Sequence, residues 1–468
     1  MNTETEGVDA RVTPQGYGGV LILCLMQLML VIDTSIVNVA LPEIRSDLGF
    51  STTGLSWVIT AYALVFGGLV LLSGKVGAMV GPRRVLLLGA SVFVVASVLG
   101  GVATTPAMLI IARALQGVGA ALAAPSVLVL LISITAPGPR RSRAMALFVV
   151  AIGTGAALGL VLGGSLTTAF GWESVMFVNV PIGLAVLAGV PRLVPETGRS
   201  AHRLDVGGAV ASTVAMTAAV YGFITAASDG WGAPWVLGAF VMAGGGLLAL
   251  VVVERRHPNP VIPPAFFTSM RSEAPFLAMF LIPAGQFGFL YFAALFTQNV
   301  LGYTPLQTGL AVVPFSLALV PTNLLTPRLA ARYGEGATGT AGMIGLFGGL
   351  LWMAQLDATS SFATGLLGPF VLLGIGAGLT IAPLTAVLLN QAPAAQVGAA
   401  SSLNQGMQQL GGAMGLAVLT TVFGGVGGGA DEAQGISTAL TFAAVFPLTA
   451  LILFAGWARP TRPVTASG

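Results

Sequence analysis

The sequence of 468 residues contains very little charge. Only 7% of the residues are Asp, Glu, Lys or Arg, whereas 55% are hydrophobic and the mean hydropathy is +0.92. A water-soluble globular protein of this length would be about one quarter charged. The scarcity of charge therefore excludes an ordinary soluble domain and predicts an all-α polytopic membrane protein.

Cysteine and histidine are also scarce. Cys24 is the single cysteine, which excludes a disulfide within the chain, and His202 and His257 lie in polar loops. We therefore expect no bound metal and no cofactor. No Walker A sequence is present, so ATP hydrolysis is not expected to drive the protein. Residues 1–16 lack the basic head and cleavage site of a signal peptide, so we expect the first apolar segment to be retained.

Long apolar runs occupy most of the chain. A membrane-spanning helix needs about 20 apolar residues, and on this basis the sequence predicts fourteen spans, of which the tenth, eleventh and thirteenth are interrupted by Gly and Pro. The approximate bounds of the spans are 17–40, 55–73, 84–103, 107–133, 144–169, 174–191, 206–227, 233–253, 274–297, 306–327, 337–356, 362–389, 398–424 and 436–457.

The basic residues gather in alternate loops. In a fourteen-span arrangement 17 of the 19 fall on one side, and the positive-inside rule makes that side cytoplasmic. Both termini are therefore predicted to be cytoplasmic, in a bacterial cell membrane, and the net charge of +3 does not indicate nucleic-acid binding. The inner basic residues are Arg11, Lys75, Arg83, Arg84, Arg140, Arg141, Arg143, Arg192, Arg199, Arg203, Arg255, Arg256, Arg271, Arg328, Arg332, Arg459 and Arg462.

Two inner loops resemble each other. Ser73–Arg84 follows the second span and Thr326–Gly336 follows the tenth, and each turns on a glycine after a basic residue, at Gly81 or Gly334. Repeated halves are typical of transporters. The predicted organisation is a tail at 1–16, a six-helix half at 17–191, two linker helices at 192–255, a second six-helix half at 256–457 and a tail at 458–468.

Two charged residues lie inside predicted spans. Asp33 stands in the apolar run Leu28–Ile44, and a charge at that depth costs roughly 3 kcal/mol on insertion scales. Arg113 is the one basic residue inside a span, and both residues lie about 10 Å below the predicted outer surface at 1.5 Å per residue. Burial disfavours the charged form of Asp33 and a nearby cation favours it, so the pair predicts a proton or ion switch. A static ion pair, or a carboxylate held by Thr34 and Ser35, would explain the same residues.

Five motifs carry a resemblance to a known family. They are IDTSIVNVALP at 32–42, WVITAYAL at 57–64, ARALQGVGAA at 112–121, GWESVMFVNVPIG at 171–183 and SSLNQGMQQLGGAMGLA at 401–417. Over nearly its whole length the chain resembles the fourteen-span drug:proton antiporters of the major facilitator superfamily. The resemblance implies two six-helix halves with two inserted central helices, and a proton-driven exporter of drugs.

The resemblance also assigns roles to residues. Asp33 would carry the proton in the substrate cavity and Arg113 would couple its release to transport. Two further groups would form the coupling helix surface, on which the halves rock, and the inner-loop gate. The coupling surface comprises Gln116, Gly117, Gly155, Gly159, Gly163 and Gly164, and the gate comprises Gly74, Lys75, Gly81, Arg83, Arg84, Arg328 and Arg332.

Three residues depart from the family's motifs. Leu160 replaces a proline after the central glycine of the fifth span, so we expect that helix to be less kinked. Ala78 and Ala331 replace an acidic residue that helps to latch the inner side, so the latch is expected to be weakened or moved to other contacts. Tight helix packing would explain the glycines equally, and anchoring at the membrane surface would explain the arginines.

Aromatic and amide residues within the spans are candidates for substrate contacts. Apolar walls with few polar groups suit small hydrophobic or amphipathic molecules, although each residue is also suited to helix packing. The candidates are Gln27, Asn38, Tyr62, Phe66, Tyr221, Gln286, Phe289, Tyr291, Asn404 and Gln408.

The predicted function is export of hydrophobic drugs or antibiotics in exchange for protons, by a monomer in the lipid bilayer. A proton-coupled or facilitative transporter of a metabolite is the alternative within transport. A membrane-embedded lipid enzyme would need clustered acid, His or Ser groups near an interface, and none is evident. A sensor or scaffold would need a soluble partner-binding domain, which the sequence does not contain.

Overall fold

The computed structural model describes residues 17–196, 206–254, 270–390, 392, 396–427 and 432–457. Within these ranges the regular structure is helical, as expected for a bilayer, where every backbone polar group must be satisfied within its own segment. Both predicted tails fall outside the described residues, as do the basic residues Arg11, Arg199, Arg203, Arg255, Arg256, Arg459 and Arg462.

The first group of helices covers the predicted first half. The chain runs through α1 (Gly18–Leu48), α2 (Thr52–Leu55), α3 (Trp57–Val80), α4 (Pro82–Gly101), α5 (Pro106–Ser133), α6 (Pro139–Phe170), α7 (Glu173–Phe177) and α8 (Asn179–Leu193). The inserted pair is α9 (Val206–Asp229) and α10 (Pro234–Glu254). The remaining helices are α11 (Met270–Leu295), η2 (Phe296–Val300), α12 (Pro305–Ala311), α13 (Val313–Tyr333), α14 (Glu335–Met353), η3 (Phe362–Leu366), α15 (Leu367–Asn390), α16 (Val397–Gly427) and α17 (Glu432–Trp457).

Twelve of the predicted spans match helices that are long and apolar enough to cross a membrane in the described part of the chain. The other two predicted spans, 337–356 and 398–424, correspond to α14 and α16, which are 19 and 31 residues long and pack among the other helices. The all-helical fold is confirmed, and the count of fourteen rests on these two helices.

Glycine turns mark the repeat that the sequence predicted. α3 ends at Gly81 with φ of 104°, and α13 ends at Gly334 with φ of 88°. A side chain at such φ values would be strained, so glycine is the residue that permits the turn. Pro82 then begins α4, at a position where its missing N–H costs nothing.

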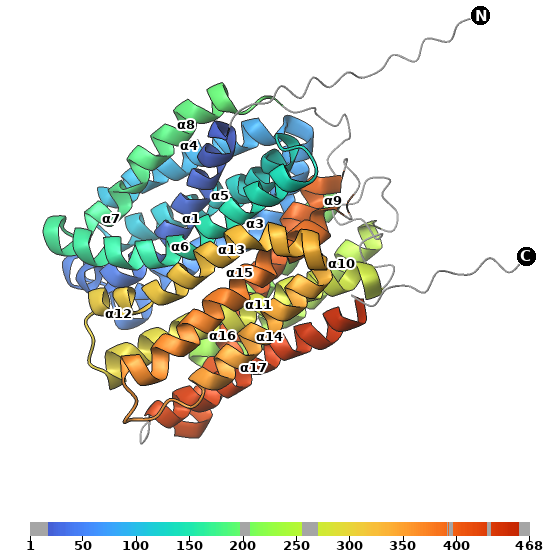
Figure 1. Ribbon diagram of the computed structural model, residues 1–468. Coiled ribbons are helices and arrows are strands. Elements are labelled where there is room, and N and C mark those ends of the chain that lie inside the picture. Colours follow the sequence, from blue (N-terminus) through green and yellow to red (C-terminus); the bar gives the residue numbers. More distant parts are fainter. Residues whose placement is uncertain are drawn as a thin grey trace, which may run out of the picture.

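The helices lie side by side in two groups, with α1–α8 on one side and α11–α17 on the other (Figure 1). The inserted helix α9 contacts both groups, since it packs against α3 and α16. A Cβ atom on Gly67 would lie 2.9 Å from Val220, and one on Gly406 would lie 3.2 Å from Met216. The inserted helix therefore covers the seam between α3 and α16.

The glycine face of α6 packs inside the first group. A Cβ on Gly155 would meet Val31, one on Gly159 would meet Ile32 O, and one on Gly163 would meet Ile36 O, all at 2.9 Å. These partners belong to α1. The prediction that this face forms a rocking surface between the halves is therefore wrong. The glycines instead allow α6 to pack closely on α1 within the first half.

A different face of α6 contacts the second group. Ser316 Oγ on α13 donates to Gly153 O at 3.3 Å. Nearer the far end of α6, a Cβ on Gly309 would lie 3.0 Å from Leu160, and one on Gly164 would lie 3.5 Å from Leu306. Of the glycines predicted to couple the halves, Gly164 is the one that lies at this contact. α6 carries no proline beyond its first residue, Pro139, as the Leu160 substitution predicts.

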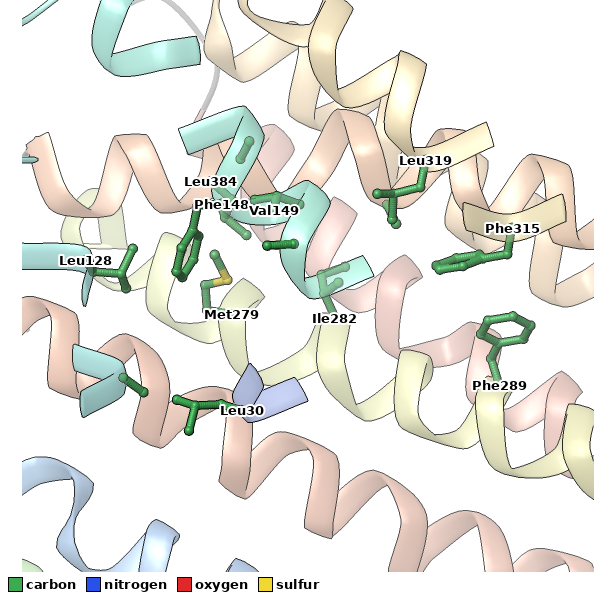
Figure 2. Close-up of a cluster of buried hydrophobic side chains, with 14 of the residues drawn as sticks. Leu30, Leu128, Phe148, Val149, Met279, Ile282, Phe289, Phe315, Leu319 and Leu384 are labelled. Atoms are coloured by element: carbon green, nitrogen blue, oxygen red, sulfur yellow. The ribbon is translucent and has the colours of Figure 1, made fainter. Parts of the chain in front are cut away.

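We call the end of the bundle at which α1 begins the predicted inner end. There α3 and α5 meet α16 through small and hydroxyl residues. Gly74 lies against Ser402 and Gly398, and Ser401 Oγ donates to Pro125 O at 2.9 Å. Toward the middle, apolar side chains from both groups fill the space, with Phe148 and Met279 pointing toward one another (Figure 2). The two halves are therefore joined at the predicted inner end.

Gly159→Ala is expected to destabilise the protein by about 1–3 kcal/mol, because the added methyl overpacks the α1–α6 contact. The new Cβ would lie 2.7 Å from Ser35 Cβ and 2.9 Å from Ile32 O. Thermal unfolding of the purified protein measures the loss. Gly164→Ala is the control on the same helix, since its nearest neighbour would be Leu306 at 3.5 Å. Equal melting temperatures for the two variants would contradict this packing.

Gly74→Ala is expected to loosen the predicted inner end, because the methyl would collide with Ser402 Oγ and lie 2.6 Å from Gly398 O. Distances between spin labels on α3 and α16 should lengthen or broaden. Gly77→Ala places its Cβ 3.9 Å from Ser126 Oγ and should leave the distances unchanged. An unchanged distribution in Gly74→Ala would argue against a steric contact there.

Candidate proton-coupling site

The two charged residues within the spans meet in the structure. Asp33 lies midway along α1 and Arg113 lies two turns into α5, and their side chains are 0% and 2% exposed. The distance from Arg113 Nη1 to Asp33 Oδ2 is 2.6 Å. The structure therefore brings Asp33 and Arg113 into contact, as their predicted equal depth in the membrane allows.

Arg113 is held on two further sides by α3. Its Nε donates to Val58 O at 2.9 Å, and its guanidinium carbon lies 4.6 Å from the centre of the Tyr62 ring. A cation over an aromatic face is attracted by the ring's electrons, and more strongly where water is excluded. These contacts fix the orientation in which the guanidinium meets the carboxylate.

Two amide side chains complete the shell around Asp33. Gln116 Nε2 donates to Asp33 Oδ1 at 3.0 Å, while Gln116 Oε1 accepts from Arg113 Nη1 at 2.7 Å. Asn179, the first residue of α8, donates from Nδ2 to Asp33 Oδ1 at 2.7 Å. Ser97 on α4 lies one step further out, 2.8 Å from Gln116 Nε2.

The hydrogen bonds explain how a charge pair survives at this depth. A buried ion pair is stable only if good geometry and additional hydrogen bonds replace the lost water. The carboxylate of Asp33 accepts three hydrogen bonds, from Arg113, Gln116 and Asn179. The network is electrically neutral as a whole when Asp33 is ionised.

An apolar cluster covers the network on the side away from the predicted inner end. Its members come from α1, α3, α5 and the α6–α7 region, and Trp172 Nε1 additionally donates to Asp47 Oδ2 at 2.9 Å. The buried members are Ile32, Ile36, Val37, Ala40, Ile44, Phe50, Val58, Ala103, Leu109, Trp172, Val175 and Met176. The expectation that Asp33 lines an open substrate cavity is therefore wrong for this structure, since its carboxylate is enclosed within the first group of helices.

A neighbouring face of α1 is open instead. Thr34 and Asn38 are exposed, whereas Gln27 and Leu30, nearer the predicted inner end, are buried. Thr34 follows Asp33 directly in the chain, so the enclosed carboxylate lies one residue away from an accessible face.

The predicted substrate residues do not form one surface. Tyr62 packs on Arg113, and Phe289 packs on Phe315 and Phe370 inside the second group, both at 5.4 Å between ring centres. Gln27, Tyr62 and Asn404 are buried, which corrects their assignment as cavity walls, whereas Phe289 lines a small pocket together with Gln286. The candidates with exposed or half-buried side chains are Asn38, Phe66, Tyr221, Gln286, Tyr291 and Gln408.

The predicted inner-gate arginines bind within their own half. Arg83 Nη2 donates to Pro191 O at 2.7 Å, and Arg84 Nε lies 3.1 Å from Glu196. Those two arginines therefore tie α4 to the end of α8 and do not bridge the halves. Arg328 and Arg332 are exposed, and Lys75 is half-buried. Gly74, another of the predicted gate residues, touches the opposite half through its backbone.

Two residues of the network were not predicted as site residues. Asn179 lies in the motif GWESVMFVNVPIG, and Ser97 lies in an apolar run of α4. An amide within an otherwise apolar span was the available signal for Asn179. Gly117 is a packing residue, because a Cβ there would lie 2.7 Å from Tyr62 O.

Arg113→Leu is expected to cost about 3–5 kcal/mol, because it leaves the carboxylate of Asp33 buried without a cation. The double variant Asp33→Asn/Arg113→Leu removes both charges and should recover much of that stability. Thermal unfolding of both proteins tests this. If Arg113→Leu were as stable as the wild type, or the double variant no more stable than the single, the ion pair would not be the constraint described.

Comparison with known proteins places the chain in a family. A profile of the Major Facilitator Superfamily matches residues 23–416. The puromycin resistance protein of Streptomyces alboniger is 37% identical over 92% of this chain and 86% of its own length. The cephamycin export protein of Amycolatopsis lactamdurans is 39% identical over 94% of this chain and 93% of its own length.

The fold agrees with solved structures. The proton:xylose symporter XylE has a TM-score of 0.68 at 14% identity, over 95% of this chain and 96% of that one. At that identity the likeness concerns the fold alone. The profile match and the two relatives establish that this chain is a membrane transporter of the Major Facilitator Superfamily.

Proposed function

We propose that this transporter exports small antibiotic or drug molecules in exchange for protons. The observation that carries the proposal is the buried pair of Asp33 and Arg113, with a carboxylate that amide groups surround inside the membrane-spanning helices. Ionisable residues at such a depth mark ion and proton pathways in transporters.

The pair suggests how proton binding can change the conformation. With Asp33 ionised, its attraction for Arg113 is strong because the surroundings exclude water. A proton on the carboxylate removes the negative charge, so Arg113 remains bonded to Gln116 and Val58 but loses its ionic partner. The balance between two arrangements of the helices then depends on proton occupancy.

The membrane potential and the pH gradient would supply the energy. One elementary charge moved across the membrane is worth about 2.3 kcal/mol per 100 mV. For a substrate or proton to enter from the predicted inner side, the contacts between the halves at that end must separate. These contacts are Gly74 with Ser402, Ser401 with Pro125, and the central apolar residues. Those contacts contain few directional bonds, which suits repeated opening.

The substrate class is supported by the relatives. Their names concern puromycin resistance and cephamycin export, and others concern tetracenomycin C and methylenomycin A. The exposed or half-buried residues Asn38, Phe66, Gln286 and Gln408 offer aromatic and amide groups, which suit amphipathic molecules. We further propose a monomer in a bacterial cell membrane with both termini cytoplasmic, as the distribution of basic residues favours.

Asp33→Asn is expected to abolish resistance in an efflux-deficient bacterial host, because the variant has no carboxylate to titrate. Puromycin, a cephamycin and tetracenomycin C are the first compounds to test, with the minimum inhibitory concentration as the measurement. Glu43→Gln is the matched control, since Glu43 is an exposed acid on the same helix. Membrane abundance of each variant is measured by immunoblot.

Proton exchange itself is tested in everted membrane vesicles. Addition of the exported compound should dissipate a preformed pH gradient with wild type and Glu43→Gln, but not with Asp33→Asn. Export that persists in Asp33→Asn, or that is indifferent to collapse of the gradient, would contradict proton exchange and favour a facilitative transporter of a metabolite.

A further inference from the structure

Asn179 has an unusual place in the network. Its side chain is fully buried, and its Nδ2 donates to Asp33 Oδ1 at 2.7 Å. The other end of the same amide, Oδ1, is buried without a hydrogen-bond partner. A buried acceptor left unpaired costs about 1–3 kcal/mol, so this arrangement needs an explanation.

We propose that Asn179 is a positioning residue that follows the protonation state of Asp33. Its amide donates to the carboxylate when Asp33 is ionised, and it turns by half a rotation to accept from the carboxyl group when Asp33 is protonated. This inference rests on the proposed proton exchange. The unpaired Oδ1 is the acceptor held ready for the protonated state.

The other partners of Asp33 cannot accept a hydrogen bond from its protonated form without losing more hydrogen bonds. Arg113 has only donors on its guanidinium. Gln116 has both amide ends engaged, since Oε1 accepts from Arg113 and Nε2 donates to Asp33 and Ser97. Turning Gln116 would break three bonds, whereas turning Asn179 breaks one and uses an atom that has no partner.

Protonation of Asp33 explains why the Asn179 amide would turn. When a proton from water binds Asp33 Oδ1, the carboxylate becomes a neutral carboxyl group with a new O–H donor. Without a turn, that O–H faces the Nδ2–H of Asn179, and two donors repel each other. The rotation about the last side-chain bond of asparagine is broad and roughly two-fold, so the turn needs no movement of the backbone.

Among the residues that the structure describes, few charged or titratable groups face Asp33. Arg113 faces it from α5 and Tyr62 lies beside that arginine from α3, while α4 contributes the neutral Ser97 and α8 contributes Asn179. The helix α6 presents glycines to α1 around this position. A neutral amide with a free acceptor is therefore the group best placed to respond to the charge of Asp33.

Infrared difference spectra of the full-length wild-type protein in lipid, recorded as the pH is lowered, test the turn directly. A carboxyl band absent from Asp33→Asn reports protonation of Asp33. Asparagine labelled with carbon-13 at its side-chain carbonyl should show a band that changes at the same pH midpoint. An Asp33 band without any asparagine change would overturn this inference and leave proton exchange standing. Absence of the Asp33 band would overturn both.

Asn179→Leu supplies the assignment. In this variant the asparagine signal should be lost, and the Asp33 carboxyl band should move to higher wavenumber because its O–H has no acceptor. Ser97→Ala is the matched control, since it removes a hydroxyl from the same network without touching Asp33. Both signals should persist there. A carboxyl band that is unchanged in Asn179→Leu would contradict the proposed hydrogen bond.

Discussion

The ion pair between Asp33 and Arg113 is the interaction on which the first half depends. Neither charge is stable alone at this depth, so each must be held against the other and against hydrogen-bonding groups. The groups that do so come from different helices, with Val58 from α3, Gln116 from α5 and Asn179 from α8. One charge pair therefore fixes the relative positions of several helices.

The contact between the halves follows a different rule. It consists of apolar side chains, such as Phe148 and Met279 (Figure 2), and of glycine and hydroxyl residues at close approach. Dispersion and small-residue packing lose energy gradually when surfaces separate, and few directional bonds must be broken. Strong polar bonds inside one half, and weak non-directional contacts between the halves, allow each half to move as a unit.

The sequence was most informative about the residue types that are rare in it. Because charge is so scarce, the sequence identified Asp33 and Arg113, and hydropathy located the helices. The ends were less accurate, since α1 continues to Leu48 and α3 to Val80, beyond the predicted ends at 40 and 73. The sequence did not show which helices pack against each other. The spacing of Gly155, Gly159 and Gly163 predicts a smooth face, but spacing does not say which helix covers it. Asn179 was missed for the same reason, because a single amide in an apolar run shows no partner until the helices are assembled.

The position of α6 connects the buried pair to the contact between the halves. One face of α6 touches α1 on both sides of Asp33, since Gly159 meets Ile32 O and Ser35. A different face of α6 meets the second half through Gly153 and Leu160. The glycine face therefore packs α6 directly on α1 beside the ion pair, and α6 is also one of the helices through which the two halves touch. The Leu160 substitution keeps that helix free of an internal proline, so the helix that contacts both the ion-pair helix and the second half is not kinked by proline.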